Sequence, residues 1–385
     1  MISSLYIKNF KALGEHLLTF KPLTLISGLN STGKSSVLQS ILTLRQSYQQ
    51  KLLPGEGLAL NGDLVSIGRG KDARFEDATE DLIEVKLINS LGIDCSWKFK
   101  CDNQENDSDV LPIISQEPAS LEIYEFSSVF NENFHYLQAE RIGPRSSFKM
   151  SNFQVAQLKS LGTQGEYTGH FLSINERSKI CNIKLSHPNV KQDEDNLGVT
   201  TPSLDLIDQV EAWLGEISPG IRLRLDPKPD LDLMSIRYQY GDSDRYRSTN
   251  VGFGITYSLP IIVAILSSKP GALIIIENPE AHLHPQGQAK IGELVALAAS
   301  CGIQIVVETH SDHVLNGIRL AVHGGKTNPD DVQLYYFQRV NKLGESIINP
   351  ISLKMNRRGR IDRWPDGFFD EWDKSLETLL DPIQE

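Results

Sequence analysis

The sequence has little of what marks secreted proteins or proteins that coat nucleic acid. It holds 4 cysteines in 385 residues and no CxxC pair, which excludes a disulfide scaffold and favours a reducing compartment. Basic residues number 38 against 49 acidic ones, and the net charge of −11 argues against non-specific coating of nucleic acid. A hydrophobic fraction of 40% excludes a disordered chain. An acidic globular protein remains.

Long apolar runs are also missing. The most apolar stretch, residues 255–266, contains Pro260 and is shorter than the roughly 20 residues that cross a bilayer. The N-terminal residues carry a charge at Lys8 and lack the apolar core of a signal peptide. We therefore expect a cytoplasmic protein without a membrane partner.

Hydrophobic patterning predicts an α/β protein in four parts. Residues 1–145 are predicted to form a β-rich lobe, with short strands that include 23–27, 83–88, 93–99, 121–126 and 134–137. Residues 146–215 lack strong periodicity and are predicted to be an inserted, partly helical arm. In residues 216–340 strands alternate with helices near 255–267, 285–299 and 311–321, which indicates a mostly parallel sheet. Residues 341–385 are expected to form a C-terminal cap. The polar tract 102–109 is expected to be a surface loop, and the polar stretch 191–196 to be part of the inserted arm.

Residues 28–35, GLNSTGKS, match the phosphate-binding pattern G-x-x-x-x-G-K-[ST] in full. A buried strand precedes this phosphate loop and a helix follows it, so backbone N–H groups and the helix N-terminus would converge on an anion. Lys34 is predicted to reach the β- and γ-phosphates, and Ser35 to bind Mg²⁺. The predicted nucleotide-binding residues here are Gly28, Asn30, Ser31, Thr32, Gly33, Lys34, Ser35 and Ser36.

Two apolar strands farther along the chain each end in polar residues. Residues 272–276 lead into Glu277, and residues 303–307 lead into a segment that contains His310. A carboxylate at the C-terminal end of a strand can hold Mg²⁺ opposite a phosphate loop, which predicts that Glu277 is a metal ligand. His310 is predicted to contact the γ-phosphate or to orient water.

These segments resemble the ABC-type ATPases of the OLD, RecF and SMC branch. The resemblance rests on IKNFKALG, GLNSTGKSS, IIIENPEAHLHP and VVETHSDHVLN. The segments NVGFGITYSLPIIVAIL, YLQAERIGP and RWPDGFFDE look more specifically like a prokaryotic AAA-labelled family that carries a small C-terminal domain of unknown function. The resemblance spans both ends of the chain and misses only the middle arm. It implies an ABC-type P-loop ATPase head with a β-rich lobe, a mostly parallel α/β lobe and an inserted helical arm.

The resemblance also implies a composite ATP site. In this branch ATP and Mg²⁺ lie between two head domains, and a signature segment of the opposite head contacts the γ-phosphate. Residues 250–256 stand in that position, with Gly252 and Gly254 as nucleotide-binding residues. Gln138 would be the Q-loop residue that senses Mg²⁺, which gives Ser35, Gln138 and Glu277 as metal ligands. A homodimer through composite ATP sites follows from the same resemblance.

The sequence departs from the ABC pattern at the general base. These enzymes usually carry Asp-Glu at the end of the second strand, whereas this chain has Glu277 followed by Asn278. An amide cannot accept a proton from water. Either Glu280 or His310 replaces the usual base, or hydrolysis is slow and the protein acts mainly as a clamp. We expect slow hydrolysis, with Lys34, Glu277, Glu280 and His310 as catalytic residues.

Two metal-enzyme alternatives are weaker. His282, His284, Asp312 and His313 add to a group rich in histidine and carboxylates, but the spacing fits neither HExxH nor HNH. Asp226, Asp230 and Asp232 suggest a two-metal nuclease, yet they fall in a proline-bearing turn. A solvated loop is the simpler interpretation.

By family analogy, such heads commonly regulate an effector, often a nuclease in prokaryotic antiphage defence, so a protein partner is expected. A RecF-like ATP-dependent DNA clamp in DNA repair is the alternative, and a purely structural role for ATP is a third. Lys354, Arg357, Arg358 and Arg360 form a basic patch beside aromatic residues. This patch is expected to pack on the core, dock a partner or bind DNA.

Overall fold

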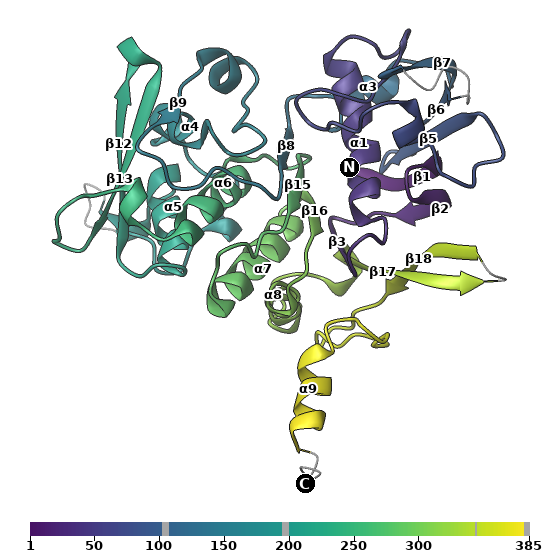
Figure 1. The fold of residues 1–385 in the computed structure, drawn as a ribbon. Helices are drawn as coiled ribbons and strands as arrows, with labels where there is room; N and C mark the ends of the chain where they lie inside the picture. The colour runs from purple at the N-terminus through teal and green to yellow at the C-terminus, as the bar shows by residue number, and fades with distance from the viewer. Residues whose placement is uncertain (102–107, 195–199, 343–344, 381–385) are drawn as a thin grey trace.

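The structure is a computed structural model that describes residues 1–101, 108–194, 200–342 and 345–380 (Figure 1). A β-rich lobe, coloured purple and blue, lies on one side of a central sheet, and a teal lobe lies on the other. The yellow C-terminal segment extends away from both lobes and ends in a projecting helix. Among the described residues, no helix combines the length and apolar character needed to cross a membrane.

The central sheet has six strands in the order β18-β17-β3-β16-β15-β8. Their bounds are Glu345–Leu353, Val332–Lys342, Leu23–Gly28, Gln304–Glu308, Leu273–Glu277 and Phe134–Leu137. The five strands from β17 to β8 are parallel, and β18 is antiparallel to β17. β3 and β16 are buried along their whole length, as expected of apolar strands covered on both faces. The C-terminal ends of the parallel strands therefore lie at one edge.

The β-rich lobe is built on an antiparallel sheet in the order β2-β1-β5-β6-β7-β4. These strands are Leu13–Thr19, Ile2–Phe10, Leu82–Asn89, Asp94–Lys100, Val110–Glu117 and Gly57–Ala59. Buried residues alternate along β5, so one face of this sheet joins a core with helix α1, Lys34–Gln49. Two short helices, α2 Gly70–Ala73 and α3 Glu122–Phe126, complete the lobe.

The second lobe packs helices around a small sheet. The sheet contains β12 Ile221–Lys228, β13 Leu233–Tyr240, β14 Tyr246–Arg247 and β9 Phe148–Lys149. The helices are α4 Thr168–Asn175, α5 Leu206–Gly215, α6 Phe253–Ser267, α7 Pro285–Ser300 and α8 Asp312–His323. A separate two-stranded sheet joins β10 Gln192–Glu194 to β11 Thr200–Pro202.

Short helical turns connect these elements. One π-helical turn covers Phe153–Gln157, and 3₁₀ turns cover Ile183–Leu185, Pro229–Leu231, Ser248–Asn250 and Pro329–Asp331. The last helix, α9 Glu371–Leu380, follows the buried ring of Phe368.

One predicted strand is wrong. Residues 121–126 are largely helix α3, because Ile123 and Tyr124 are buried as neighbours on one helix face rather than alternating as in a strand. The strand of this region is β7, which sequence reasoning missed. Of the polar tract 102–109, residues 102–107 lie outside the described residues, as do residues 195 and 196 of the tract 191–196.

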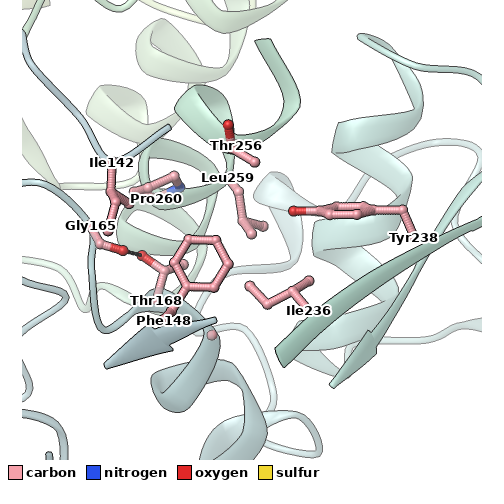
Figure 2. A pocket seen from close by; sticks show the side chains of 10 residues that line it. Ile142, Phe148, Gly165, Thr168, Ile236, Tyr238, Thr256, Leu259 and Pro260 are labelled. Atoms are coloured by element: carbon pink, nitrogen blue, oxygen red, sulfur yellow. Dashed lines mark hydrogen bonds between the residues drawn. The ribbon is translucent and has the colours of Figure 1, made fainter. Parts of the chain in front are cut away.

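A small apolar cavity lies between α6 and the small sheet (Figure 2). It has a volume of about 10 Å³ and is lined by residues that include Phe148, Ile236, Tyr238, Leu259 and Pro260. Such a volume holds about one water molecule. The cavity is therefore a packing gap and no candidate for a nucleotide site.

Candidate nucleotide-binding site

The phosphate loop is held by backbone constraints that explain its glycines. Gly28 has φ +150°, and a Cβ atom on it would lie 2.2 Å from the carbonyl oxygen of Phe337 in β17. Gly33 has φ +84° and forms the N-cap of α1. Both positions favour glycine because an L side chain would be strained there. The Thr32 hydroxyl donates to the Leu29 carbonyl at 2.7 Å and closes the loop.

Lys34 folds back across this loop. Its Nζ donates to the carbonyls of Gly28 at 3.0 Å and Leu29 at 2.7 Å. Burial lowers the pKa of the Lys34 ammonium, and the charge of Glu308 opposes that shift. A phosphate group in the loop would offer this buried cation a stronger acceptor than two carbonyls.

Two carboxylates meet at the sheet edge beside the loop. Glu277 at the end of β15 and Glu308 at the end of β16 are register partners on adjacent parallel strands. The Ser35 hydroxyl lies 3.2 Å from both carboxylate oxygens of Glu308. Glu277 accepts from the Tyr136 hydroxyl at 3.0 Å and from the backbone N–H of Ala139 at 3.2 Å.

The electrostatics of this pair favour a cation. Burial and the neighbouring charge of Glu277 raise the pKa of Glu308 to about 7. Burial also raises the pKa of Glu277, although the donors Tyr136 and Ala139 counteract it. A positive ion beside the two carboxylates would relieve the cost of burying both charges.

The donors fit Mg²⁺ bound together with a nucleotide. A hydroxyl and carboxylates are the oxygen ligands that Mg²⁺ prefers. Across the described ranges, no group of three or more His, Cys, Asp or Glu side chains forms a metal site by itself. Phosphate oxygens would therefore have to complete the coordination of an ion held by Ser35 and Glu277, with Glu308 adjacent.

The two candidates for the general base, Glu280 and His310, lie next to each other. Both carboxylate oxygens of Glu280 are held, by the Thr309 hydroxyl at 2.7 Å and by the His310 backbone N–H at 2.9 Å. His310 lies at the surface, and partial desolvation of its ring together with the charge of Lys34 lowers its pKa. Asn278 has φ +43° and donates through Nδ2 to Glu280 at 3.5 Å. The structure thus places Glu280 and His310 together, directly after β15 and β16.

The buried Arg141 side chain links three elements at this edge by hydrogen bonds. It is 2% exposed and donates to the carbonyls of Glu277 at 2.6 Å, Asn278 at 2.6 Å, Gln138 at 2.9 Å and Tyr257 at 3.1 Å. Its guanidinium also lies 5.4 Å from the centre of the Tyr257 ring. Burial lowers the pKa of Arg141 to about 10, which leaves the side chain charged at neutral pH. One cation therefore joins the end of β8, the end of β15 and helix α6.

Gln138 lies after β8, as predicted, but its side chain does not contact Glu277 in this structure. Its Nε2 donates to the Glu140 carbonyl at 3.3 Å. The neighbouring backbone N–H of Ala139 makes the contact with Glu277 instead.

The signature segment 250–256 packs on the turn that follows β15. The Phe253 ring lies 5.1 Å from the His282 ring, and Tyr257 contacts the same histidine at 4.7 Å. A Cβ atom on Gly254 would lie 2.7 Å from the His282 carbonyl oxygen, whereas one on Gly252 would meet open space. Gly252 is exposed and forms the N-cap of α6, so its backbone is accessible to another molecule.

Glu308, Arg141 and Tyr136 are functional candidates that the sequence analysis did not select. Glu308 carried the clearest signal, because it ends an apolar strand just as Glu277 does. Strands β15 and β16 could not be paired in register from the sequence alone. The contacts of Arg141 have no sequence signal beyond its position close to Gln138.

Comparisons with known proteins identify the family of the chain. A family model described as "AAA ATPase domain" matches residues 1–203, which is more than half of the chain. The chain belongs to this AAA ATPase family. Residues 182–316 match "AAA domain, putative AbiEii toxin, Type IV TA system", and residues 327–379 match "Protein of unknown function (DUF3696)". The predicted AAA-labelled family with a C-terminal domain of unknown function is confirmed.

Solved structures similar to this AAA ATPase are head domains. The SMC head domain from Thermotoga maritima is 13% identical, with a TM-score of 0.46, over 91% of this chain and 98% of that chain. A head bound to the C-winged helix domain of ScpA is 14% identical, with a TM-score of 0.47, over 91% and 98%. A head from Pyrococcus furiosus bound to the C-terminal domain of ScpA is 13% identical, with a TM-score of 0.44, over 99% of both chains. No curated protein matches the chain.

The predicted fold class is confirmed. The chain is an α/β protein in which a β-rich lobe and a mostly parallel sheet meet at the phosphate loop.

Proposed function

We propose that this AAA ATPase is an ATP-driven switch whose two copies associate head to head around composite ATP sites. The observation that carries the proposal is the open backbone of the signature segment. The phosphate loop, Glu277 and Glu308 gather at one edge of one chain. The signature segment 250–256 packs on the turn after β15 and leaves Gly252 open. A second copy would bring its open signature segment to the γ-phosphate.

Within one site, each residue has a distinct task. The loop glycines would let backbone N–H groups approach the phosphates, and Lys34 would bind their charge. Ser35, Gln138 and Glu277 would hold Mg²⁺, which neutralises phosphate charge when it is bound. Tyr136 and Arg141 would position Glu277, because they contact its carboxylate and its carbonyl.

We further propose that hydrolysis is slow. Asn278 provides no base, and the Glu280 carboxylate is already held by two donors. The lowered pKa of His310 keeps its imidazole neutral near pH 7, so that a ring nitrogen can accept a proton from water. Both Glu280 and His310 remain candidates for the base.

The output of the switch would be a protein effector, such as a nuclease in prokaryotic antiphage defence. The toxin–antitoxin wording of the family matched by residues 182–316 supports a role beside a second gene product. The net charge of −11 is compatible with action through a protein partner.

A mixing experiment tests the composite site. Lys34→Ala removes the phosphate-loop cation, and Gly252→Glu places a negative charge where the partner's γ-phosphate would lie. Each variant alone should lack ATPase activity, while an equimolar mixture after subunit exchange should recover about a quarter of wild-type activity, because half of the dimers hold one intact site. A mixture as inactive as its components would contradict the shared site.

A DNA clamp is the second candidate, and the exposed arginines of residues 357–360 favour it. DNA affinity that requires ATP and falls steeply with salt would support this function over effector regulation.

A further inference from the structure

Helix α9 exposes an apolar face that nothing in the described chain covers. Trp372, Leu376, Leu379 and Leu380 follow helical spacing and are 75%, 45%, 80% and 76% exposed. The helix has ten residues and no buried side chain. Isolated helices shorter than about 12–15 residues are marginal in water, so this helix needs a partner surface to be stable.

The base of α9 is nevertheless fixed to the molecule. Lys374 pairs with Asp366 at 2.5 Å and with Asp370 at 3.0 Å. The Tyr336 hydroxyl donates to the Asp366 carbonyl at 3.1 Å, and Phe368 is buried. These contacts direct the helix away from its own chain, as Figure 1 shows. The apolar face is therefore presented outward.

Three carboxylates of α9 also lack a cationic partner. Glu371, Asp373 and Glu377 lie on the helix, and no ion pair within the described residues involves any of them. Within the part of the chain that the structure describes, Glu371 accepts a hydrogen bond of 3.4 Å from the Ser375 hydroxyl. Helix α9 therefore presents both unpaired carboxylates and exposed apolar side chains.

A second surface of the same chain carries the opposite, positive charge. Arg357, Arg358 and Arg360, the basic loop, line an open depression of about 410 Å³ together with Asn356. All three arginines are exposed, and among the described residues none forms an ion pair. Trp364, which is 42% exposed, lies nearby and contacts Arg319, whose Nε donates to the Gly359 carbonyl.

The backbone of the basic loop is held by contacts within the chain. The Asn356 side chain accepts from the backbone N–H groups of Arg358 at 2.9 Å and Arg360 at 3.1 Å. Gly359 has φ +69° and packs so closely on Arg319 that a Cβ atom would lie 2.5 Å from its carbonyl oxygen. A preformed backbone lowers the entropy that the loop loses when a ligand binds its arginines.

We propose that α9 of one copy docks on the basic loop of a second copy, in a reciprocal clasp. Asp373 and Glu377, which border the apolar face on one side of the helix, then face the unpaired guanidiniums, and the apolar face of α9 meets the surface around Trp364. By two-fold symmetry, each copy gives one helix and receives one. Nucleic acid on the basic loop would leave the apolar face of α9 uncovered, so a second copy accounts for both surfaces. The clasp needs no nucleotide and is separate from the ATP site.

Charge reversal tests the clasp in the nucleotide-free full chain by light scattering. The helix variant carries Glu371→Lys, Asp373→Lys and Glu377→Lys, and the loop variant carries Arg357→Glu, Arg358→Glu and Arg360→Glu. Wild type should be a dimer, and each variant alone should dissociate at least tenfold more readily. The two variants mixed should form a dimer again, because both contacts then join opposite charges.

A control variant with Asp226→Lys, Asp230→Lys and Asp244→Lys makes the same change of charge as the helix variant at exposed positions of the other lobe and should stay dimeric. Circular dichroism on every variant checks that the fold is retained. Three outcomes would overturn the clasp: a wild type that is monomeric without nucleotide, reversed variants as dimeric as wild type, or a mixture that stays monomeric. Binding of labelled DNA that depends on the basic loop, with an unchanged oligomeric state, would show that nucleic acid is the occupant instead.

Discussion

The edge of the central sheet and the C-terminal segment differ in how far their charged side chains are buried and paired. At the sheet edge Lys34, Arg141, Glu277 and Glu308 are largely buried, and each has named partners within the chain. In the C-terminal segment the basic loop and the carboxylates of α9 are exposed and form no ion pair with any described residue.

The difference indicates where another molecule is needed. Charges buried in a protein must be paired or hydrogen-bonded, and at the sheet edge they are, so that this chain alone positions the phosphate loop and the metal ligands. Exposed charges and apolar side chains of the C-terminal segment contribute little to folding, and they are free to bind a second surface. Substitutions at the sheet edge should therefore change catalysis, stability or ATP-dependent association, whereas those in α9 should change only the association that needs no nucleotide.

The largest effect is expected at Glu277. Glu277→Gln keeps the shape of the side chain but removes the charge that would bind Mg²⁺. Steady-state phosphate release should fall by about 100- to 1,000-fold, as for loss of a preorganised electrostatic contact. Turnover equal to wild type would refute the assignment of Glu277, and unchanged thermal unfolding would confirm that the protein is folded.

Arg141 should matter mainly for stability. Arg141→Met removes four hydrogen bonds to partly buried carbonyls, so the free energy of unfolding should drop by about 3–5 kcal/mol. Denaturant titration measures this change, and Arg141→Lys should recover part of it. A loss below about 1 kcal/mol in Arg141→Met would mean that water satisfies these carbonyls.

Two glycines of the signature segment provide a matched pair. Gly254→Ala places a Cβ atom 2.7 Å from the His282 carbonyl and should cost about 1–3 kcal/mol of stability. Gly252→Ala meets open space and should change stability by less than about 0.5 kcal/mol. Equal melting temperatures for the two variants would show that the segment is loosely packed.

The buried sheet should also make stability depend on pH. Burial, together with the charge of Arg45, lowers the pKa of His135 in β8 from 6.5 to about 4. The unfolded state therefore takes up a proton at higher pH than the folded state, and stability should fall by about 1–3 kcal/mol as pH drops from 6.5 to 4. His135→Gln should flatten the unfolding free energy over this range, and an unchanged slope would assign the dependence to other groups.

The smallest effect on folding is expected in α9. Leu379→Ser removes an 80% exposed apolar side chain and should change the unfolding free energy of the monomer by less than about 0.5 kcal/mol. Chemical denaturation at low protein concentration measures this value. A loss of 2 kcal/mol or more would show that α9 packs on its own chain.

Local sequence signals predicted much of the sheet edge. The spacing of Gly28, Gly33 and Lys34 and the apolar strands before Glu277 and Glu308 are features of short segments, and the structure brings these segments together. Helices such as α6 and α7 also follow from long apolar or periodic runs. The partners of Arg141 could not be predicted, because they come from three elements that are distant in sequence. Strand β7 was missed because it has neither a fully apolar nor a strictly alternating pattern. Helix α9 does carry apolar residues at helical spacing, a signal that the sequence analysis did not use.

The central claim is that ATP itself joins two heads at the edge of the sheet. Light scattering on the loop variant, in which the clasp is broken, tests this claim separately from the clasp. The account predicts a monomer without nucleotide and a dimer with ATP and Mg²⁺, and it predicts that adding Lys34→Ala abolishes the dimer. A loop variant that binds ATP and stays monomeric at every ATP concentration would contradict it.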